Sequence, residues 1–377
     1  MAQALDAAWA RSLEAAEASG RQRRLQAEQR VADSWLAAPP ALALSQREGQ
    51  GAAADGVRET EVGVALPLWR LGQRQRNQES AQAESQWQAA AQQAARLRLA
   101  ALLRDQVGRL RLAEADVWQA TQQRRLFETL SDDVERRVRA GDLAPADAMA
   151  AKADLLASQT LERDASQAVD TQRSAWRLLT GWAATPEPDA LLDLPSEDTA
   201  LAQHPEAQLA EAAVQRARSR VAQAHAQRGL PPELGIGMRQ ERPGSGQARQ
   251  NTVALSLRVP FGTDTHSQPA IAAALAEQDL ALVTQERIRR QLTADLELAR
   301  RQLDRSEAQV AAGQEQATLL RERTNLLNHA FQAGESPLPE LLRAMGASAQ
   351  AEIASARQQA ALAQARARLQ QALGVMP

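Results

Sequence analysis

The chain has 377 residues, a formal net charge of −2 and a pI near 6.2, so its overall charge does not mark it as a nucleic-acid-binding protein. It contains no cysteine, which excludes disulfides, thiol catalysis, iron–sulfur clusters and thiolate zinc sites. Tyrosine is absent, and no run of about 20 apolar residues could form a transmembrane helix. The abundance of Ala, Gln, Arg, Glu and Leu indicates long packed helices rather than a large mixed core.

The N-terminal segment is expected to be helical, because apolar residues recur at helical spacing from Ala2 to Trp35. Pro39-Pro40 ends that helix, since proline disfavours helical backbone within and before it. Two strands follow at 41–48 and 57–68, on either side of a glycine-rich turn. The first residues lack the charged and apolar regions of a signal peptide, which leaves a cytosolic protein or a mature exported chain with an added start methionine.

Two long helical hairpins dominate the remaining pattern. Helical spacing runs from Trp69 to Ala140, and these 72 residues would extend roughly 110 Å. A second helix returns after a turn, so that the first hairpin occupies 69–181. A proline-containing loop and a shorter helix then lead to the second set of elements, which comprises strands at 233–241 and 251–261 and a helical hairpin at 266–374.

The chain contains an internal repeat. Three pairs of similar segments share one offset of 193 residues, and they centre on Pro67 and Pro260, Gly141 and Gly334, and Gly181 and Gly374. A chance likeness would not keep the same offset through a strand, a turn and a helix end, so a whole structural module is duplicated. We therefore predict one protomer made of two repeats, 1–195 and 196–377, each with two strands followed by a helical hairpin.

The strand segments alternate apolar and polar residues with period 2, and each is about 8–12 residues long, close to what a tilted strand needs to cross a bilayer. A half-buried strand in a soluble sheet would show the same alternation. The apolar row is predicted to face lipid and consists of Leu42, Leu44, Val62, Val64, Leu66, Leu234, Ile236, Val253, Leu255, Leu257 and Val259. Trp69 and Phe261, just past the return strands, are the candidate aromatic residues of the membrane interface.

Four strands cannot close a barrel around water, and lipid does not tolerate an open sheet edge. Three copies of the chain would supply twelve strands and remove the edges. The sequence therefore favours an oligomer over a monomer if the strands cross a membrane.

This layout resembles the TolC-like outer-membrane efflux channels over almost the entire chain. The resemblance is most specific in the strand ends Val64-Ala-Leu-Pro-Leu-Trp69 and Leu257-Arg-Val-Pro-Phe-Gly262, and in the turns Ala140-Gly-Asp-Leu-Ala-Pro-Ala-Asp147 and Ala333-Gly-Glu-Ser-Pro-Leu-Pro-Glu340. It implies a mainly α fold with a small β part and internal duplication. It also implies a homotrimer whose 12-stranded transmembrane β-barrel continues into a 12-helix periplasmic α-barrel.

The resemblance implies a passive exit duct in the outer membrane of a Gram-negative bacterium, with a periplasmic extension, contacts to outer-membrane lipid and neither catalytic residues nor a cofactor. Such a duct docks a periplasmic adaptor protein and an inner-membrane pump. Within the family, the run from Arg258 to Asp264 is most similar to channels of heavy-metal cation efflux systems of the RND type. A type I secretion or drug-efflux channel is the alternative, and a periplasmic adaptor or a structural coiled-coil protein is the alternative from another class.

The two hairpin turns contain the candidate functional residues. Gly141 and Gly334 can adopt the left-handed conformation that ends a helix, and Asp142, Glu335 or Ser336 could cap the next helix. In the resembling family this level is a periplasmic constriction lined by acidic side chains, which implies a gate that includes Asp147 and Glu340. The sequence departs from the family at Arg343, where a second acid can stand, and we expect Arg343 to pair with Glu340 or Asp147 and complete the gate. The tips that an adaptor could reach comprise Gly141, Asp142, Leu143, Gly334, Glu335 and Leu338.

No metal site is predicted. The four histidines are scattered along the chain, and no pair of them has the spacing of metal ligands.

Overall fold

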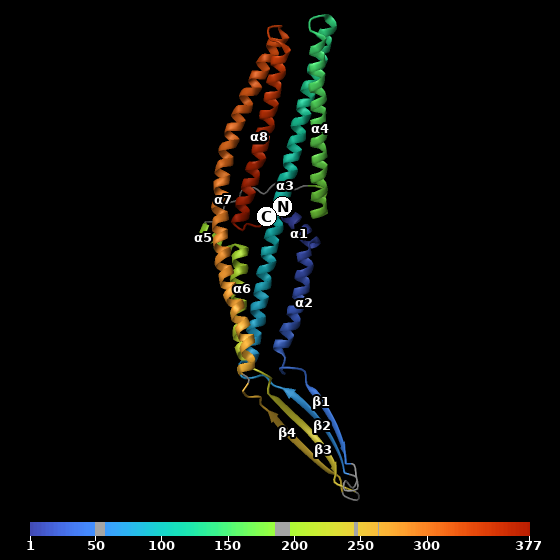
Figure 1. Cartoon of the computed structure of the whole chain (residues 1–377), viewed down its shortest axis with the longest axis vertical. Coiled ribbons are helices and arrows are strands. Elements are labelled where there is room, and N and C mark those ends of the chain that lie inside the picture. Colours follow the sequence, from blue (N-terminus) through green and yellow to red (C-terminus); the bar gives the residue numbers. More distant parts are fainter. Residues whose placement is uncertain (50–56, 185–196, 245–247, 263) are drawn as a thin grey trace. The chain divides into compact units, whose positions relative to one another are not determined.

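The computed structural model describes residues 1–49, 57–184, 197–244, 248–262 and 264–377 (Figure 1). Its helices are α1 (Ala2–Arg11), α2 (Leu13–Asp33), α3 (Gln73–Ala140), α4 (Pro145–Thr180), α5 (Glu197–Gln203), α6 (Pro205–Ala226), α7 (Asp264–Gln332) and α8 (Leu338–Ala372). Its strands are β1 (Ala41–Glu48), β2 (Arg58–Pro67), β3 (Glu233–Arg242) and β4 (Gln250–Arg258). Within the described ranges, no helix is long and apolar enough to span a bilayer.

The chain forms two compact units, and each repeat contributes to both. Unit 1 consists of Met1–Ala15, Gln93–Pro205 and Arg289–Pro377, and unit 2 consists of Ala16–Gln92 and Glu206–Ile288. The helices α3 and α7 contribute one part to each unit. Helix α3 has 68 residues, which corresponds to about 100 Å of helix.

In unit 1 the two helical hairpins, α3–α4 and α7–α8, are joined through contacts between α3 and α8. The guanidinium of Arg104 on α3 donates to the side chain of Gln371 at 3.0 Å and to the carbonyl of Val375 at 2.9 Å. The Gln371 side chain in turn donates to the carbonyl of Leu97 at 3.1 Å. A seam between the repeats therefore runs inside the protomer.

Apolar clusters hold the helices of unit 1 together at several levels. The largest lies beside the hairpin turns and contains Phe127, Leu130, Val134, Ala151, Leu155, Phe331, Leu338, Leu341 and Met345. Farther along the bundle, Leu5 and Ala8 of α1 pack with Leu103 and the fully buried Trp176. Because such burial contributes roughly 25 cal/mol per Å² of apolar surface, these clusters fix how the helices pack within the unit.

In unit 2 the four strands form one antiparallel sheet in the order β1-β2-β3-β4. The strand pairs of the two repeats meet between β2 and β3, where Val64 pairs with Ile236. The helical part of this unit contains a partly buried ion cluster in which Glu84 accepts from Arg216 at 2.5 Å and Arg220 at 3.2 Å. The sheet and the adjoining helix segments belong to one compact unit.

Most predicted elements are present, with shifts at their ends. Helix α3 starts at Gln73 instead of Trp69, because Gly72 has a φ of +76° and forms a turn there. Strand β4 ends at Arg258, so Val259 and Phe261 lie beyond it. The predicted single N-terminal helix is wrong: Ser12 is extended, with a ψ of 152°, and separates α1 from α2. Helix α5 was not predicted, since its few residues carry little periodic signal.

Three predicted connections lie partly or wholly outside the described residues. These are the turn after β1, the proline-containing loop after α4 and part of the loop between β3 and β4, at 50–56, 185–196 and 245–247.

Candidate functional site

One face of the sheet is a continuous apolar surface. The register places the predicted lipid-facing residues of the strands, together with Met238, in rows: Leu44, Val62, Met238 and Val253; Leu42, Val64, Ile236 and Leu255; and Leu66, Leu234 and Leu257. In the protomer Leu42, Val253 and Leu255 are each about three-quarters exposed, at 74%, 76% and 74%. The alternation in the sequence therefore corresponds to a single apolar face, most of whose residues are exposed in the described part of the protomer.

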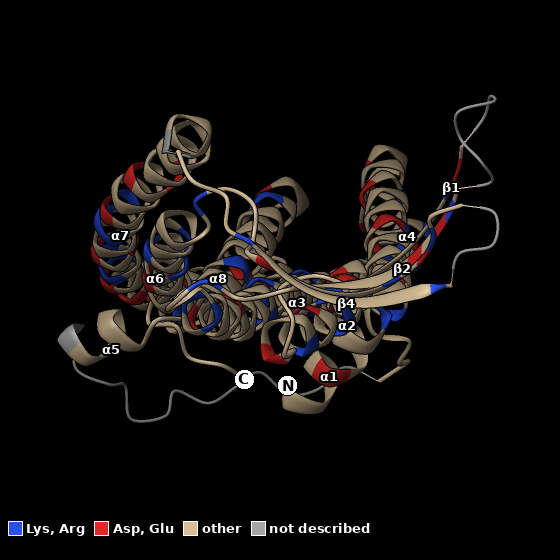
Figure 2. Ribbon diagram, turned by 90° about the horizontal axis from the view of Figure 1, so that it is seen from below, with Lys and Arg blue, Asp and Glu red and all other residues tan. Residues whose placement is uncertain are grey.

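The opposite face of the sheet is lined by small residues over the same stretch. Its rows are Ala43, Gly63, Gly237 and Ala254, and Ala41, Ala65, Gly235 and Ser256. Nearer the loop between β1 and β2, charged residues occupy the strands, as Figure 2 shows. There Arg239 on β3 pairs with Glu59 at 2.8 Å and with Glu61 at 3.7 Å. These charged side chains thus lie on the same face of the sheet as Gly63 and Gly237, beyond the small residues and toward the loops.

The two predicted interface aromatics differ in exposure. Phe261 is 94% exposed, whereas Trp69 is half-buried and its indole N–H donates to the carbonyl of Ser34 at 3.0 Å. That hydrogen bond ties the end of β2 to the end of α2, so the indole has a structural partner. Trp35 was not predicted as an interface residue. It follows Ser34 directly in the chain and is 89% exposed.

At the tips, both hairpins turn through the same glycine geometry. Gly141 and Gly334 have φ values of +87° and +79°, which favour glycine strongly over residues with a Cβ. The Gly141 N–H donates to the Val138 carbonyl at 3.1 Å and the Asp142 N–H to the Arg137 carbonyl at 2.9 Å, the two bonds of a Schellman motif. The same pair recurs at Gly334 and Glu335, at 3.1 and 2.8 Å.

The returning helices start differently from the expectation. The N-cap positions are Ala144 and Pro337, and neither Asp142 nor Glu335 nor Ser336 caps a helix, so that prediction is wrong. The physical reason is the residue at the third helical position. Asp147 reaches back, and its Oδ2 accepts the Ala144 N–H at 3.2 Å, which satisfies a backbone donor at the helix start.

Glu340 is the repeat counterpart of Asp147 but cannot make that bond. The equivalent N-cap residue is Pro337, which has no N–H to donate. In the described part of the protomer no hydrogen bond or ion pair joins Glu340 to Asp147 or Arg343, and the Arg343 guanidinium donates to the Pro339 carbonyl at 3.1 Å. The predicted pairing of Arg343 with an acid is thus not made within one protomer.

Two of the predicted tip residues pack in the apolar core of the protomer. Leu338 is 2% exposed in the apolar cluster at the tip, and Leu143 packs against that cluster. Leu338 is therefore corrected from a docking residue to a core residue of the protomer. Gly141, Asp142, Gly334 and Glu335 are exposed and remain candidates for contact with a partner.

An arginine that sequence reasoning missed links the two hairpins at the tip. The Arg137 guanidinium lies over the Phe331 ring at 4.7 Å and donates to the Phe331 carbonyl at 3.2 Å. Its Nε also pairs with Asp133 at 3.0 Å. The repeat offset could have drawn attention to it, because the counterpart of Arg137 is Ala330 and no equivalent link can form there.

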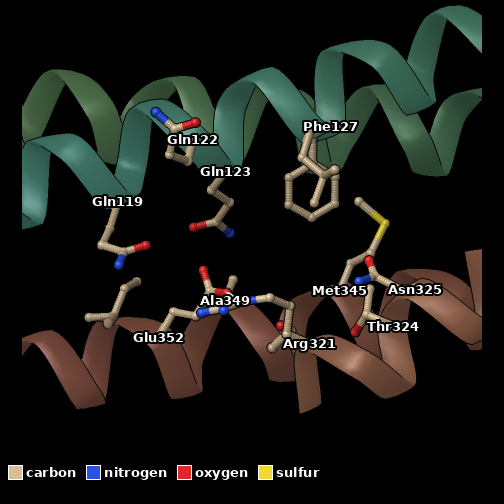
Figure 3. A pocket seen from close by; sticks show the side chains of 13 residues that line it. Gln119, Gln122, Gln123, Phe127, Arg321, Thr324, Asn325, Met345, Ala349 and Glu352 are labelled. Carbon is tan, nitrogen blue, oxygen red and sulfur yellow. Dashed lines mark hydrogen bonds and ion pairs between the residues drawn. The ribbon is translucent and has the colours of Figure 1, made fainter. Parts of the chain in front are cut away.

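Beside this cluster lies a cavity of about 270 Å³ between α3 and the α7–α8 hairpin, lined by both polar and apolar side chains (Figure 3). Amide side chains of Gln119, Gln122 and Gln123 line its α3 side, and the Arg321–Glu352 ion pair, at 2.7 Å, lies on the other side. Phe127 and Met345 close the end next to the apolar cluster. The seam is therefore apolar at the tip and more loosely packed below it.

Among the described residues, no group of three or more His, Cys, Asp or Glu side chains could hold a metal ion.

Comparison with known proteins places this geometry in one class. The sequence model of the family described as "Outer membrane efflux protein" matches residues 197–375. No curated protein sequence matches the chain significantly.

Solved structures match over nearly the whole chain. A membrane protein from Pseudomonas aeruginosa superposes with a TM-score of 0.80 at 17% identity, covering 99% of this chain and 89% of that one. CusC gives a TM-score of 0.79 at 16% identity, with 99% and 91% covered. The outer membrane protein VceC from Vibrio cholerae gives 0.78 at 15% identity, with 99% and 95% covered.

Residues 197–375 thus match the outer membrane efflux protein family, and the whole chain has the fold of TolC-like outer-membrane channels. The predicted class, a mainly α, TolC-like fold with a small sheet, is confirmed.

Proposed function

We propose that three copies of this chain form the passive outer-membrane duct of a tripartite efflux system, docked to a periplasmic adaptor and an inner-membrane RND pump. The observation that carries the proposal is the four-stranded sheet with one apolar face and two unpaired edges, β1 and β4, every residue of which is exposed in the protomer. A sheet with open edges is unstable in lipid, because unpaired N–H and C=O groups cannot be hydrated there.

Closure by three copies would satisfy these edges. The strand β4 of one copy would pair with β1 of the next, giving twelve strands with Leu42, Leu255 and their row toward lipid and the small residues around Gly63 and Gly237 toward the lumen. Small side chains on the lumen face leave room for a wide bore. The helical hairpins would form the periplasmic tunnel, with Trp35, Trp69 and Phe261 near the membrane interface.

The hairpin tips would form the periplasmic constriction. The Glu340 carboxylate does not cap its helix, because the N-cap residue is Pro337. We therefore expect this carboxylate to face the lumen, where three copies would provide a ring of three acids. Arg343 and Asp147 would complete the closed state through contacts between copies. Gly141, Asp142, Gly334 and Glu335 would present the docking surface to the adaptor.

Heavy-metal cations are the proposed cargo. The support is the similarity of the run from Arg258 to Asp264 to channels of heavy-metal efflux systems, together with the acid ring at the tip, which attracts cations. Selectivity would reside mainly in the pump. Deleting the gene should lower tolerance to such metals and leave tolerance to drugs unchanged. Lost drug tolerance with normal metal tolerance would favour a drug-efflux channel.

A matched pair of arginine substitutions tests the membrane assignment. Leu255→Arg places a charge on the proposed lipid face and should reduce insertion into liposomes, since such a charge costs about 2–4 kcal/mol near the bilayer midplane. Ala254→Arg, one residue away on the proposed lumen face, should insert normally. Equal insertion of both variants would contradict the assignment of the faces.

A further inference from the structure

A groove on the first hairpin remains open at the tip. It is lined by Val138, Pro145, Ala148, Met149, Lys152 and Leu156, and Met149 and Leu156 are 74% and 53% exposed. Lys152 at its rim is the single lysine of the chain. An apolar groove of this kind at a hairpin tip needs an occupant.

The repeat itself shows what covers such a face. With the 193-residue offset, Pro145, Ala148 and Lys152 correspond to Leu338, Leu341 and Met345 of α8. Those three residues are buried, and they pack in one cluster with the α3 residues Phe127, Leu130 and Val134. The face of α8 that corresponds to the open groove is thus covered by the first helix of the other repeat.

The same offset identifies the matching surface on α7. The α3 residues Phe127, Leu130 and Val134 correspond to Leu320, Arg323 and Leu327. Leu320 and Leu327 are half-buried, and Leu327 packs against the apolar cluster at the tip. Arg323 is exposed, as are Leu319 and Leu326 on the same side of the helix, at 60% and 71%. In the described part of the protomer, helix α7 therefore has an exposed stripe of Leu319, Arg323 and Leu326 at the level of the groove.

The two surfaces differ from their counterparts in a consistent way. Lys152 stands in place of Met345 and Arg323 in place of Leu130, so two cations replace two buried apolar side chains. The Arg137 link to Phe331 is also lost, because its counterparts are Ala330 and Val138. In the described part of the protomer neither Lys152 nor Arg323 forms an ion pair.

We propose that α7 of a second copy covers the groove on the first hairpin, in the way that α3 covers α8 within one copy. Lys152 and Arg323 make this contact between copies weaker than the contact between α3 and α8. The inference rests on the proposed trimer. It identifies the contact between helices that separates first in that trimer. Like charges brought into one contact repel, and two large apolar side chains no longer contribute burial. The seam between copies then parts at the tip while the seam within the protomer stays closed.

The single lysine makes coverage of the groove directly measurable. Acetylation of Lys152 by an N-hydroxysuccinimide ester, followed by mass spectrometry, should be at least about tenfold slower in the assembled trimer than in the dissociated chain. Asp142→Lys provides a control amine on the exposed turn, which should react equally in both states. Full reactivity of Lys152 in a stable trimer would overturn this inference alone.

Substitutions that copy residues of the α3–α8 contact into the contact between copies test whether the contact between copies is the weaker one. The variant Lys152→Met with Arg323→Leu copies the apolar pair of the internal seam, and its trimer should dissociate at least about tenfold more slowly in SDS, about 1.4 kcal/mol. The control Lys152→Arg with Arg323→Lys keeps both charges and should dissociate like the wild type. Unchanged or faster dissociation of the apolar variant would overturn the inference. A chain that never forms a trimer would instead overturn the proposed function, and this inference with it.

Discussion

The helices that return from the two tips, α4 and α8, carry equivalent positions in different surroundings. On α8 these positions are Leu338, Leu341 and Met345, buried against α3, and on α4 they are Pro145, Ala148 and Lys152 around an open groove. The backbone geometry of the two turns is the same, down to the paired hydrogen bonds of the Schellman motifs. The two repeats therefore share the geometry of the turn. The residues on the returning helix differ between the repeats according to what each helix face contacts.

The largest effect should come from truncating the covered face. Leu341→Ala removes a fully buried side chain and should lower the free energy of unfolding by about 2–5 kcal/mol, measured by urea denaturation of the dissociated chain. Leu156→Ala makes the same chemical change on the face that is open in the dissociated chain, where the side chain is half-exposed, and should cost less than about 1 kcal/mol there. Equal losses at both sites would contradict the distinction between the faces.

A smaller effect is expected from the contact between Arg137 and Phe331, which joins the two hairpins of one protomer. Arg137→Ala removes the contact with the Phe331 ring and the hydrogen bond to its carbonyl, and should cost about 1–3 kcal/mol. Hydrogen exchange at the last turn of α7 should become faster in this variant. Arg136→Ala, the exposed neighbour, is the control, and exchange that changes as much there as in Arg137→Ala would show that Arg137 has no special role.

The smallest stability effect separates the two acids at the helix starts. Asp147→Ala removes the hydrogen bond to the Ala144 N–H and should destabilise the first turn of α4 by about 0.5–2 kcal/mol, seen as faster amide exchange there. Glu340→Ala should leave the first turn of α8 unchanged, because its carboxylate caps no donor. Faster exchange in α8 would contradict this division of roles.

The strands, the face on which their apolar residues lie and the helical hairpins could be predicted from the sequence because period and offset survive in the residue pattern. The two-residue period of the strands identified one face, and the register then brought Leu42, Val64, Ile236 and Leu255 into one row. The offset likewise located the turn glycines Gly141 and Gly334.

The contacts between the hairpins could not be predicted, because they depend on how two helices lie in space. The Arg137–Phe331 contact joins residues with no pattern linking them, and the burial of Leu338 follows from α8 lying against α3. The capping error has a local cause, since the N-cap positions are Ala144 and Pro337, two residues after Asp142 and Glu335.

The central claim is that copies of this chain close into an outer-membrane channel. Purified protein reconstituted in planar bilayers should form a trimer that conducts ions in discrete steps, and Glu340→Ala should change the conductance or the preference for cations. A protein that stays monomeric in detergent, inserts in no bilayer and gives no conductance would contradict the account.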